Sequence, residues 1–343
     1  MPIITHLIID QTGAFLSKHQ GRLQVKKEKE ILQQAPLMHL EQVLITGNGI
    51  SLSADVIAAC AEEGIPIYFI SPLGRPYASL YAAGLTQTVL TRRAQLLAYT
   101  EPSGLAFALA LARAKISNQA AMLRYRAKYQ KETNPILYEE LRRLALEVLD
   151  PLAELESLAG EQTSLDPIRA NLLGLEGRAA KKYWAGVRLA VAVGDDWPGR
   201  KGRGATDPLN AALNYGYGIL YGQVERAIVL AGLDPYAGFI HVDRPGKPSL
   251  VLDLIEEFRQ PVVDRAIFAI FNKGSEVALD DQHLLTADSR KLIAAKVLER
   301  LDKTEGYEGK KVPLRLIIQN QARHLATFLR GDREVYEPFS VKW

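Results

Sequence analysis

Cysteine is nearly absent from this sequence, since Cys60 is the only one among 343 residues. A single thiol excludes an internal disulfide and any zinc cluster built on cysteines. Folding that depends on disulfides in an oxidising compartment is therefore excluded as well. We expect the protein to fold and work in a reducing, cytoplasmic setting.

Long hydrophobic runs are absent too. No stretch approaches the ~18 consecutive apolar residues of a membrane-spanning helix, so we expect no membrane association. The N-terminal stretch MPIITHLIIDQTG lacks the basic and apolar regions of a signal peptide. With 48% hydrophobic and 24% charged residues, the composition is that of an ordinary globular protein. The length allows two domains and a sizeable core.

An excess of charge of one sign is also missing. The chain has 42 Lys and Arg against 39 Asp and Glu, for a net charge of +3. A nucleic-acid partner is compatible with this balance if the basic residues cluster on one surface. The sequence contains neither a Gly-x4-Gly-Lys-Ser/Thr phosphate loop nor a Gly-x-Gly-x-x-Gly motif after a strand, which argues against the common nucleotide-binding folds.

The first eighty or so residues have the pattern of β-strands around one helix. Residues 14–17 and 22–26 flank a four-residue turn that contains Gly21, which predicts a hairpin. Ser51 or Ser53 is expected to cap a helix that runs to Glu63, and Gly64 to end it. The polar residues 27–34 favour a helical connector. Short apolar runs closed by turn residues predict further strands at residues 3–9, 42–46, 65–70 and 77–82.

From about Thr88 onward the pattern becomes helical. Apolar residues recur at helical spacing over residues 89–99, 103–131, 135–159 and 167–193. No strand pattern of comparable strength returns. Because the change falls near Gly84, we predict an α+β fold, with a small β-rich N-terminal domain over residues 1–84 and a larger all-α C-terminal domain over residues 85–343.

The segment over residues 238–264 has the strongest pattern of a functional site. His241 precedes a Pro- and Gly-rich turn, and Ser249 stands where a helix N-cap belongs. On the helix that follows, Asp253, Glu256 and Glu257 are neighbours in space, opposite an apolar face. One imidazole facing several carboxylates suits Mg²⁺ or Mn²⁺ better than Zn²⁺. The alternative interpretation is an ordinary solvated helix face.

A second segment raises the case for a metal site. Asp166-Pro167 is a strong helix start. Further along that helix, Glu176 lies among apolar residues, and the helix-unfavourable Gly177 after it suggests the close approach of another group. Taken alone, this pattern is more commonly that of a surface glutamate at the edge of an apolar face.

A glycine-rich basic loop lies between the two segments. It carries Arg200, Lys201 and Arg203, and it ends in Asp207-Pro208, which starts another helix. A basic loop followed by a helix with buried polar residues fits a nucleic-acid channel. It also fits an ordinary loop and a well-packed helix, and composition does not separate the two.

With both segments in view, the chain resembles the CRISPR-associated integrase family, the catalytic subunit of the spacer-acquisition complex. The resemblance covers nearly the whole length, and its motifs are specific in this order and spacing. In chain order they comprise residues 43–49, 64–69, 175–177, 207–211, 214–217, 231–235, 238–241, 244–250 and 253–259.

The resemblance implies which residues form the site. Glu176, His241 and Glu256 correspond to the catalytic residues that bind the divalent metal, and the family has Asp or Glu at the last of these positions. Asp253 is implied as a supporting residue or an alternative ligand. The residues expected to face DNA are Arg200, Lys201, Arg203, Arg244 and Lys247.

The activity that the resemblance implies is that of a metal-dependent DNA endonuclease and integrase. A metal that polarises a phosphate permits attack by a DNA 3′-hydroxyl, which joins strands, or by water, which nicks them. The implied partners are double-stranded DNA and a small dimeric adaptation subunit. We also expect a homodimer, formed through the small apolar β-domain, because two DNA ends require two sites.

Two other functions stay open. One is a non-catalytic nucleic-acid-binding scaffold of the same fold. The other is a metal-dependent phosphoesterase that acts on small substrates, which would need no basic groove and no salt-sensitive DNA binding.

Overall fold

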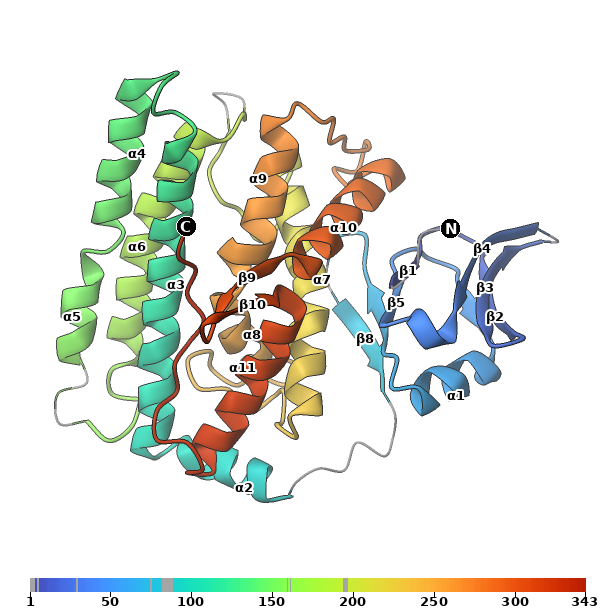
Figure 1. Ribbon diagram of the computed structural model, residues 1–343, viewed down its shortest axis with the longest axis horizontal. Coiled ribbons are helices and arrows are strands. Elements are labelled where there is room, and N and C mark those ends of the chain that lie inside the picture. Colours follow the sequence, from blue (N-terminus) through green and yellow to red (C-terminus); the bar gives the residue numbers. More distant parts are fainter. Residues whose placement is uncertain are drawn as a thin grey trace.

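The computed structural model describes residues 4, 6–28, 30–74, 76–81, 89–158, 160, 162–193 and 197–343. Strands occupy the N-terminal part, and helices dominate from residue 89 onward, as Figure 1 shows. The prediction of an α+β fold is therefore confirmed. The predicted boundary near Gly84 lies outside the described residues.

Two four-stranded sheets and one helix build the N-terminal part. The first sheet has the order β1-β5-β7-β8 and is parallel except between β7 and β8, and the second has the order β4-β3-β2-β6. Of the two predicted N-cap candidates, Ser53 is the one that caps α1, since its side chain accepts a hydrogen bond from the backbone N–H of Val56. The elements are β1 (His6–Ile9), β2 (Phe15–His19), β3 (Arg22–Lys27), β4 (Glu30–Pro36), β5 (Gln42–Ile45), β6 (Ser51–Leu52), α1 (Ala54–Glu62), β7 (Ile67–Ile70) and β8 (Pro76–Leu80).

Strands β2 and β3 form the predicted hairpin, but its turn is shorter than expected. The antiparallel pairing continues to His19 and Arg22, which leaves two residues in the turn instead of four. These residues, Gln20 and Gly21, have φ angles of 46° and 73°. Positive φ at both central residues is typical of the turn that suits the twist of a two-residue hairpin.

The predicted helical connector over residues 27–34 is wrong, because β4 occupies most of it. Strand β4 pairs antiparallel with β3 and forms one edge of the second sheet. Most of its side chains are exposed, and Ala35 alone among its residues is fully buried. A polar edge strand lacks the apolar alternation of a half-buried strand, so its pairing partner determines its structure and local propensity does not.

The helical part follows the predicted order with two differences. The predicted helix over residues 135–159 is divided, because Pro151 lacks the N–H that would continue the hydrogen-bond ladder. Helix α6 starts after the predicted Asp166-Pro167, and Asp166 instead accepts hydrogen bonds from Tyr99 and Arg169. The helices are α2 (Val89–Ala98), α3 (Pro102–Lys128), α4 (Pro135–Glu147), α5 (Pro151–Leu158), α6 (Arg169–Ala190), α7 (Pro208–Leu230), α8 (Ser249–Leu254), α9 (Arg265–Asn272), α10 (Ala287–Asp302) and α11 (Leu314–Leu329).

A small hairpin corrects the expectation that the C-terminal part is all α. Strands β9 (Thr304–Tyr307) and β10 (Lys310–Pro313) pair antiparallel between α10 and α11. Their turn, Glu308-Gly309, has positive φ at both residues. The two strands are short and largely polar, so they lack the hydrophobic pattern from which strands are predicted.

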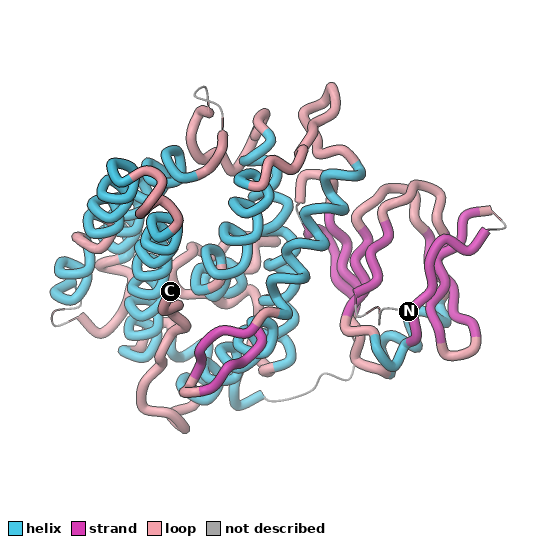
Figure 2. The backbone as a smooth tube through the Cα atoms, turned by 45° about the horizontal axis from the view of Figure 1, so that its top comes forward, coloured by secondary structure: helices cyan, strands magenta, loops and turns pink. Residues whose placement is uncertain are grey.

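The first sheet packs on both of its faces, as its central position in Figure 2 indicates. Val43 and Ile45 belong to the core between the two sheets, whereas Leu44 and Tyr68 belong to the core of the helical part. The turn after β7 lies against α7: a Cβ on Gly218 would stand 1.7 Å from the carbonyl oxygen of Gly74. The strand-rich and helical parts are therefore joined by an extensive contact.

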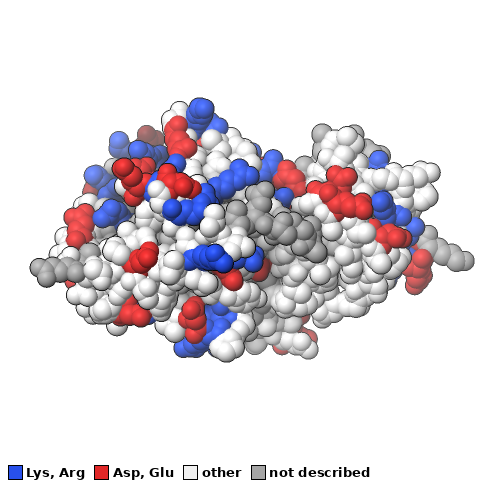
Figure 3. All heavy atoms as spheres, turned by 90° about the horizontal axis from the view of Figure 1, so that it is seen from below, with Lys and Arg blue, Asp and Glu red and all other residues white. Residues whose placement is uncertain are grey.

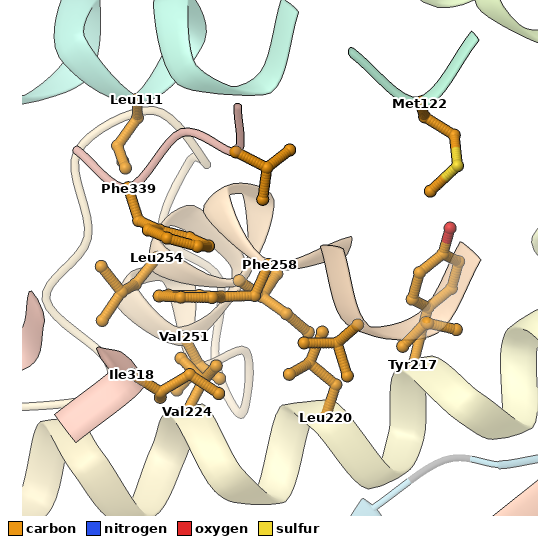
Figure 4. Close-up of a cluster of buried hydrophobic side chains, with 14 of the residues drawn as sticks. Leu111, Met122, Tyr217, Leu220, Val224, Val251, Leu254, Phe258, Ile318 and Phe339 are labelled. Atoms are coloured by element: carbon orange, nitrogen blue, oxygen red, sulfur yellow. The ribbon is translucent and has the colours of Figure 1, made fainter. Parts of the chain in front are cut away.

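The helical core surrounds the segment that follows α7. Figure 4 shows Val251, Leu254 and Phe258 packed between α3, α7, α11 and the C-terminal residues, and the rings of Phe258 and Phe339 are stacked 5.6 Å apart. This packing fixes the backbone that carries the predicted carboxylates. Within the described part of the chain, no helix combines the length and apolar character that crossing a membrane requires.

Candidate active site

The segment after Pro248 is a continuous buried helix whose pitch changes along its length. Helix α8 passes into a 3₁₀ turn over Ile255–Glu257 and then into a π-helical stretch over Arg259–Asp264. Asp253 and Glu257 are completely buried, and Glu256 is 5% exposed. The interpretation of these carboxylates as a solvated helix face is therefore wrong.

Ser249 joins the start of this helix to the loop before it. Its hydroxyl accepts a hydrogen bond from the backbone N–H of Gly238 at 2.9 Å and lies 2.6 Å from a carboxylate oxygen of Asp243. We predicted Ser249 as the N-cap of α8. Ser249 is instead the first residue of this helix, and Pro248 occupies the N-cap position. Gly238 is required here because a Cβ would stand within 2.7 Å of the Ser249 and Leu250 backbone.

Asp253 organises the loop that carries His241. Its carboxylate accepts hydrogen bonds from the backbone N–H groups of Phe239, Ile240 and His241 at 2.6, 3.1 and 3.0 Å. The same carboxylate lies 2.7 Å from Nδ1 of the His241 ring. A proton on Nδ1 directs the lone pair of Nε2 away from Asp253, which is the arrangement found when histidine binds a metal. With both oxygens occupied, Asp253 is placed to support the site.

Glu176 and Glu256 come together on the ammonium group of Lys115. The Lys115 nitrogen lies 3.0 Å from Glu176 Oε2 and 3.3 Å from Glu256 Oε2. Arg259 makes a second ion pair with Glu256, at 3.0 Å. Glu176 and Glu256 lie far apart in the sequence, and they meet because α6 and the 3₁₀ turn after α8 both pack on α3.

The charges around Glu256 keep it ionised. Burial raises its pKa, but Arg259, Lys115 and His241 outweigh burial and bring the pKa to about 2. Burial raises the pKa of Glu176, against the opposing effect of Lys115. Burial lowers the pKa of Lys115, but the two glutamates outweigh it, so the net shift is upward. The cluster therefore has a strong preference for a positive charge at its centre.

His241 belongs to the same cluster, since it lowers the pKa of both Glu176 and Glu256. Glu176 and Glu256 thus share one ion-pair partner, and His241 is near enough to affect both of them electrostatically. In the described part of the chain no three side chains already stand at the spacing of a complete metal shell. The Lys115 nitrogen lies between the two carboxylates and keeps them apart.

The predicted DNA-facing residues fall into two groups. Lys201, Arg203 and Arg244 are exposed and Lys247 is half-buried, so these four reach the surface. Arg200 turns inward, where its guanidinium donates hydrogen bonds to the side-chain oxygens of two residues of α7, Asn210 and Asn214. It also lies 5.8 and 5.5 Å from the ring centres of Trp184 and Tyr217. On the face seen in Figure 3, basic and acidic side chains are interspersed.

Sequence reasoning missed Lys115 and Arg259 as parts of the site. A signal for Lys115 is present, because it stands between the buried Ala114 and Ile116 on a helix that is buried over most of its circumference. A lysine in such surroundings is rarely buried without a partner. The sequence gives no indication of which helix carries that partner.

The fold and the cluster define a class: a two-part α+β protein with a glutamate–histidine–glutamate site buried in its helical part. The family model described as CRISPR associated protein Cas1 matches residues 7–299. The chain belongs to this family, and the predicted resemblance is confirmed.

Curated relatives match over nearly the whole chain. A CRISPR-associated endonuclease Cas1 of Archaeoglobus fulgidus is 37% identical, over 98% of this chain and 99% of the relative. A CRISPR-associated endonuclease Cas1 of Francisella tularensis subsp. novicida is 33% identical, again over 98% and 99%. At the level of the family, the prediction of a CRISPR-associated nuclease and integrase is confirmed.

Solved structures agree on the fold. A casposase bound to its integration product has a TM-score of 0.83 at 23% identity and covers 99% of this chain and 95% of its own. A Cas6–RT–Cas1–Cas2 complex has a TM-score of 0.73 at 23% identity and covers 100% and 37%. A Cas1 protein from Thermotoga maritima has a TM-score of 0.72 at 19% identity and covers 96% and 98%.

Proposed function

We propose that Glu176, His241 and Glu256 bind a divalent cation, Mg²⁺ or Mn²⁺, and that with it the protein cuts and joins DNA in CRISPR spacer acquisition. The observation that carries this proposal is the cluster on Lys115, in which two buried carboxylates share one cation. Family membership supports the reaction class, and the cluster supports the assignment of these residues to it.

The residues fit a hard divalent ion. Glu256 Oε2 is buried, and among the described residues it has the Lys115 ammonium 3.3 Å away but no well-aligned hydrogen bond. A buried carboxylate oxygen without a hydrogen bond is costly unless a cation is nearby. Carboxylate oxygens and one imidazole are the ligands that Mg²⁺ and Mn²⁺ accept.

A divalent ion held here would polarise a phosphate and lower the pKa of the attacking hydroxyl or water. Asp253 would keep the Nδ1 proton on the His241 ring, so that Nε2 stays free to bind. Glu256 would remain ionised throughout the neutral range because its pKa is about 2. A DNA 3′-hydroxyl as nucleophile gives strand joining, and water gives a nick.

DNA would approach over the exposed basic residues of the two loops, Lys201, Arg203, Arg244 and Lys247. In the proposed arrangement Arg200 orders the first of these loops from within. The casposase relative is bound to an integration product, which supports a DNA substrate for this chain.

For assembly, we propose that residues 1–84 form a dimerisation domain and residues 85–343 the catalytic domain. Strands β2 and β4 of the second sheet and the turn after β4 expose Phe15, Ile31 and Met38, and Met38 is 80% exposed. Exposed apolar side chains on a small sheet are typical of an interaction surface. A small dimeric partner of the Cas2 type is supported by the Cas6–RT–Cas1–Cas2 complex.

The test is a cleavage and strand-joining assay on DNA with free 3′-hydroxyl ends, with Mn²⁺, with Mg²⁺ and with a chelator. We expect activity with either ion, none with the chelator, and none in the His241→Ala variant, because the variant loses one ligand. His19→Ala, an exposed histidine outside the cluster, is the matched control and should keep full activity.

Full activity of folded His241→Ala would contradict the assignment of the site. The absence of any cleavage by the wild-type protein, with DNA binding retained, would favour the scaffold function. Hydrolysis of small phosphodiesters without salt-sensitive DNA binding would favour the phosphoesterase.

A further inference from the structure

Lys115 occupies an unusual place in α3. Its nitrogen contacts carboxylates from two different elements, Glu176 on α6 and Glu256 on the 3₁₀ turn after α8. Both carboxylate side chains are 7% exposed, whereas the Lys115 side chain is 17% exposed. The lysine side chain is therefore somewhat more accessible to solvent than the two carboxylates.

Two ionised carboxylates at this depth repel each other strongly, because the surroundings screen charge much less than water does. Arg259 lies on the opposite oxygen of Glu256, 3.0 Å away, and neutralises part of that charge. The ammonium of Lys115 is the cation that both carboxylates share. It lies where a positive charge is most stable in the absence of any other ion.

We propose that Lys115 is an internal counter-ion, which fills the cation position between Glu176 and Glu256 and has to withdraw when a divalent ion binds. This inference rests on the proposed function, since it concerns the ion at that same site. Lys115 competes with the metal, so it lowers the metal affinity of the free protein. In return it stabilises the metal-free fold by separating two buried like charges.

The flexible four-carbon stem of lysine suits this role. A lysine ammonium is a point charge that can rotate away without moving the backbone of α3. An arginine at the same position would hold both carboxylates through several N–H groups at once and would leave less readily. The choice of lysine over arginine at residue 115 therefore determines how easily the site accepts a metal ion.

The experiment measures Mn²⁺ binding to the full chain by calorimetry, for the wild type and for Lys115→Gln. We expect Lys115→Gln to bind Mn²⁺ at least about tenfold more tightly, since it removes a positive charge a few ångströms from the ion. Its metal-free form should melt at a lower temperature than the wild type, and Mn²⁺ should raise its melting temperature by more. Lys128→Gln, on the exposed end of the same helix, should leave both quantities unchanged.

If Lys115→Gln does not fold, the variant Lys115→Arg provides a second test of the proposal. It preserves the charge and should bind Mn²⁺ at least about tenfold more weakly than the wild type, because the guanidinium holds the carboxylates through more hydrogen bonds. Unchanged or weaker Mn²⁺ binding by folded Lys115→Gln would overturn the proposal. Unchanged or tighter binding by Lys115→Arg would overturn it as well.

A further variant separates this proposal from the proposed function. If Glu176→Gln no longer binds Mn²⁺ but the Lys115 variants bind it as the wild type does, the metal site is supported and the counter-ion role is contradicted. If Glu176→Gln binds Mn²⁺ as the wild type does, the metal site itself is elsewhere, and both proposals fall.

Discussion

Asp264 is fully buried, and two tyrosine hydroxyls donate hydrogen bonds to it. The hydroxyl of Tyr183 lies 2.5 Å from one carboxylate oxygen, and the hydroxyl of Tyr217 donates to the other. Burial raises the pKa of Asp264 to about 6, against the opposing effects of these hydrogen bonds and of the nearby Arg200 and Arg259. The carboxyl group is therefore more easily ionised in the unfolded chain than in the folded one.

This shift predicts a defined pH dependence of stability. A pKa that is higher in the folded state stabilises the protein below the unfolded value, near 3.8, and this contribution is lost as pH rises through about 6. Relative to Asp264→Asn, the wild type should lose about 2–3 kcal/mol of unfolding free energy between pH 4 and pH 7, at 1.36 kcal/mol per unit of pKa. Urea unfolding at several pH values measures it.

The control for this prediction is Asp281→Asn, which changes an exposed aspartate in a loop. Its difference from the wild type should be nearly independent of pH over the same range. A constant difference between wild type and Asp264→Asn would show that the buried carboxyl titrates normally, and the prediction would then be wrong.

Single residues also mark the limit of what the sequence could predict. Glu176, His241 and Glu256 lie in motifs with a fixed local order, so their grouping follows from a resemblance to known sequences. Arg259 pairs with Glu256 three residues before it, but Lys115 joins them only because α3 packs across both segments. Such crossings depend on the tertiary packing of whole helices, which no local pattern encodes.

Among the elements, α7 meets the strand-rich part through side chains, such as Glu225 with Ser79, and also through a close backbone contact. Gly218 faces the carbonyl of Gly74, and an added Cβ would overlap it at 1.7 Å. Gly177 on α6 is different, because a Cβ there would meet nothing within 4 Å among the described residues. The close approach that we expected at Gly177 is not made by any described part of this chain.

The two glycines make a matched pair for measurement. Gly218→Ala should destabilise the protein by several kcal/mol, roughly 3 or more, because backbone on both sides prevents relief of the overlap. Gly177→Ala should stabilise it by up to about 1 kcal/mol, the helix propensity gained over glycine. Chemical denaturation of both variants provides the values. Equal effects would contradict the contact between α7 and the turn after β7.

The basic loop before α7 contains two kinds of arginine. Arg203 is exposed, and Arg203→Ala should weaken DNA binding and reduce the salt slope by about one per lost phosphate contact, without lowering the melting temperature. Arg200→Ala should lower the melting temperature, because Asn210 and Asn214 lose a charged donor. Anisotropy titrations at several salt concentrations and thermal unfolding separate the two effects.

The opposite pattern would contradict this division of roles. If Arg200→Ala kept the stability of the wild type and Arg203→Ala kept both its affinity and its salt slope, the loop would be an ordinary surface turn. The sequence placed both arginines on the same loop, but it could not predict that one of them turns toward Trp184 and Tyr217.

Strand β4 and the hairpin β9–β10 show where element prediction fails. Strand β4 is polar and lies at a sheet edge, and β9 and β10 are short and largely polar, so all three bury too few side chains to leave a periodic signal. The long helices and the buried strands β5 and β7 were predictable because most of one face, or both, is apolar. Residues 30–36 form strand β4 because they hydrogen-bond to β3, and their own sequence does not reveal this pairing.

For the whole molecule, we predict that a homodimer forms through the exposed face of the strand-rich part. Two substitutions there, Ile31→Lys and Met38→Lys, should convert a dimer to a monomer at micromolar concentration, because each places a charge on an apolar contact. Ile136→Lys changes an exposed residue at the start of α4 and is the control. Light scattering coupled to size exclusion measures the mass.

A wild-type protein that is monomeric at these concentrations would contradict the dimer. A dimer that persists in the double variant would place the interface elsewhere. Point substitutions are preferable to deletion of residues 1–84, because that deletion would remove Leu44 and Tyr68, which belong to the core of the helical part.

The C-terminal residues pass through the middle of the helical part and complete the layer beneath the active site. The backbone N–H of Phe339 donates to the buried Glu257, next to Glu256, and the N–H of Val341 donates to Asn118 on α3. During synthesis these residues leave the ribosome after every helix of the site. The candidate site therefore cannot be completed while its polypeptide is still growing through residue 339, and we expect products of premature termination to lack it.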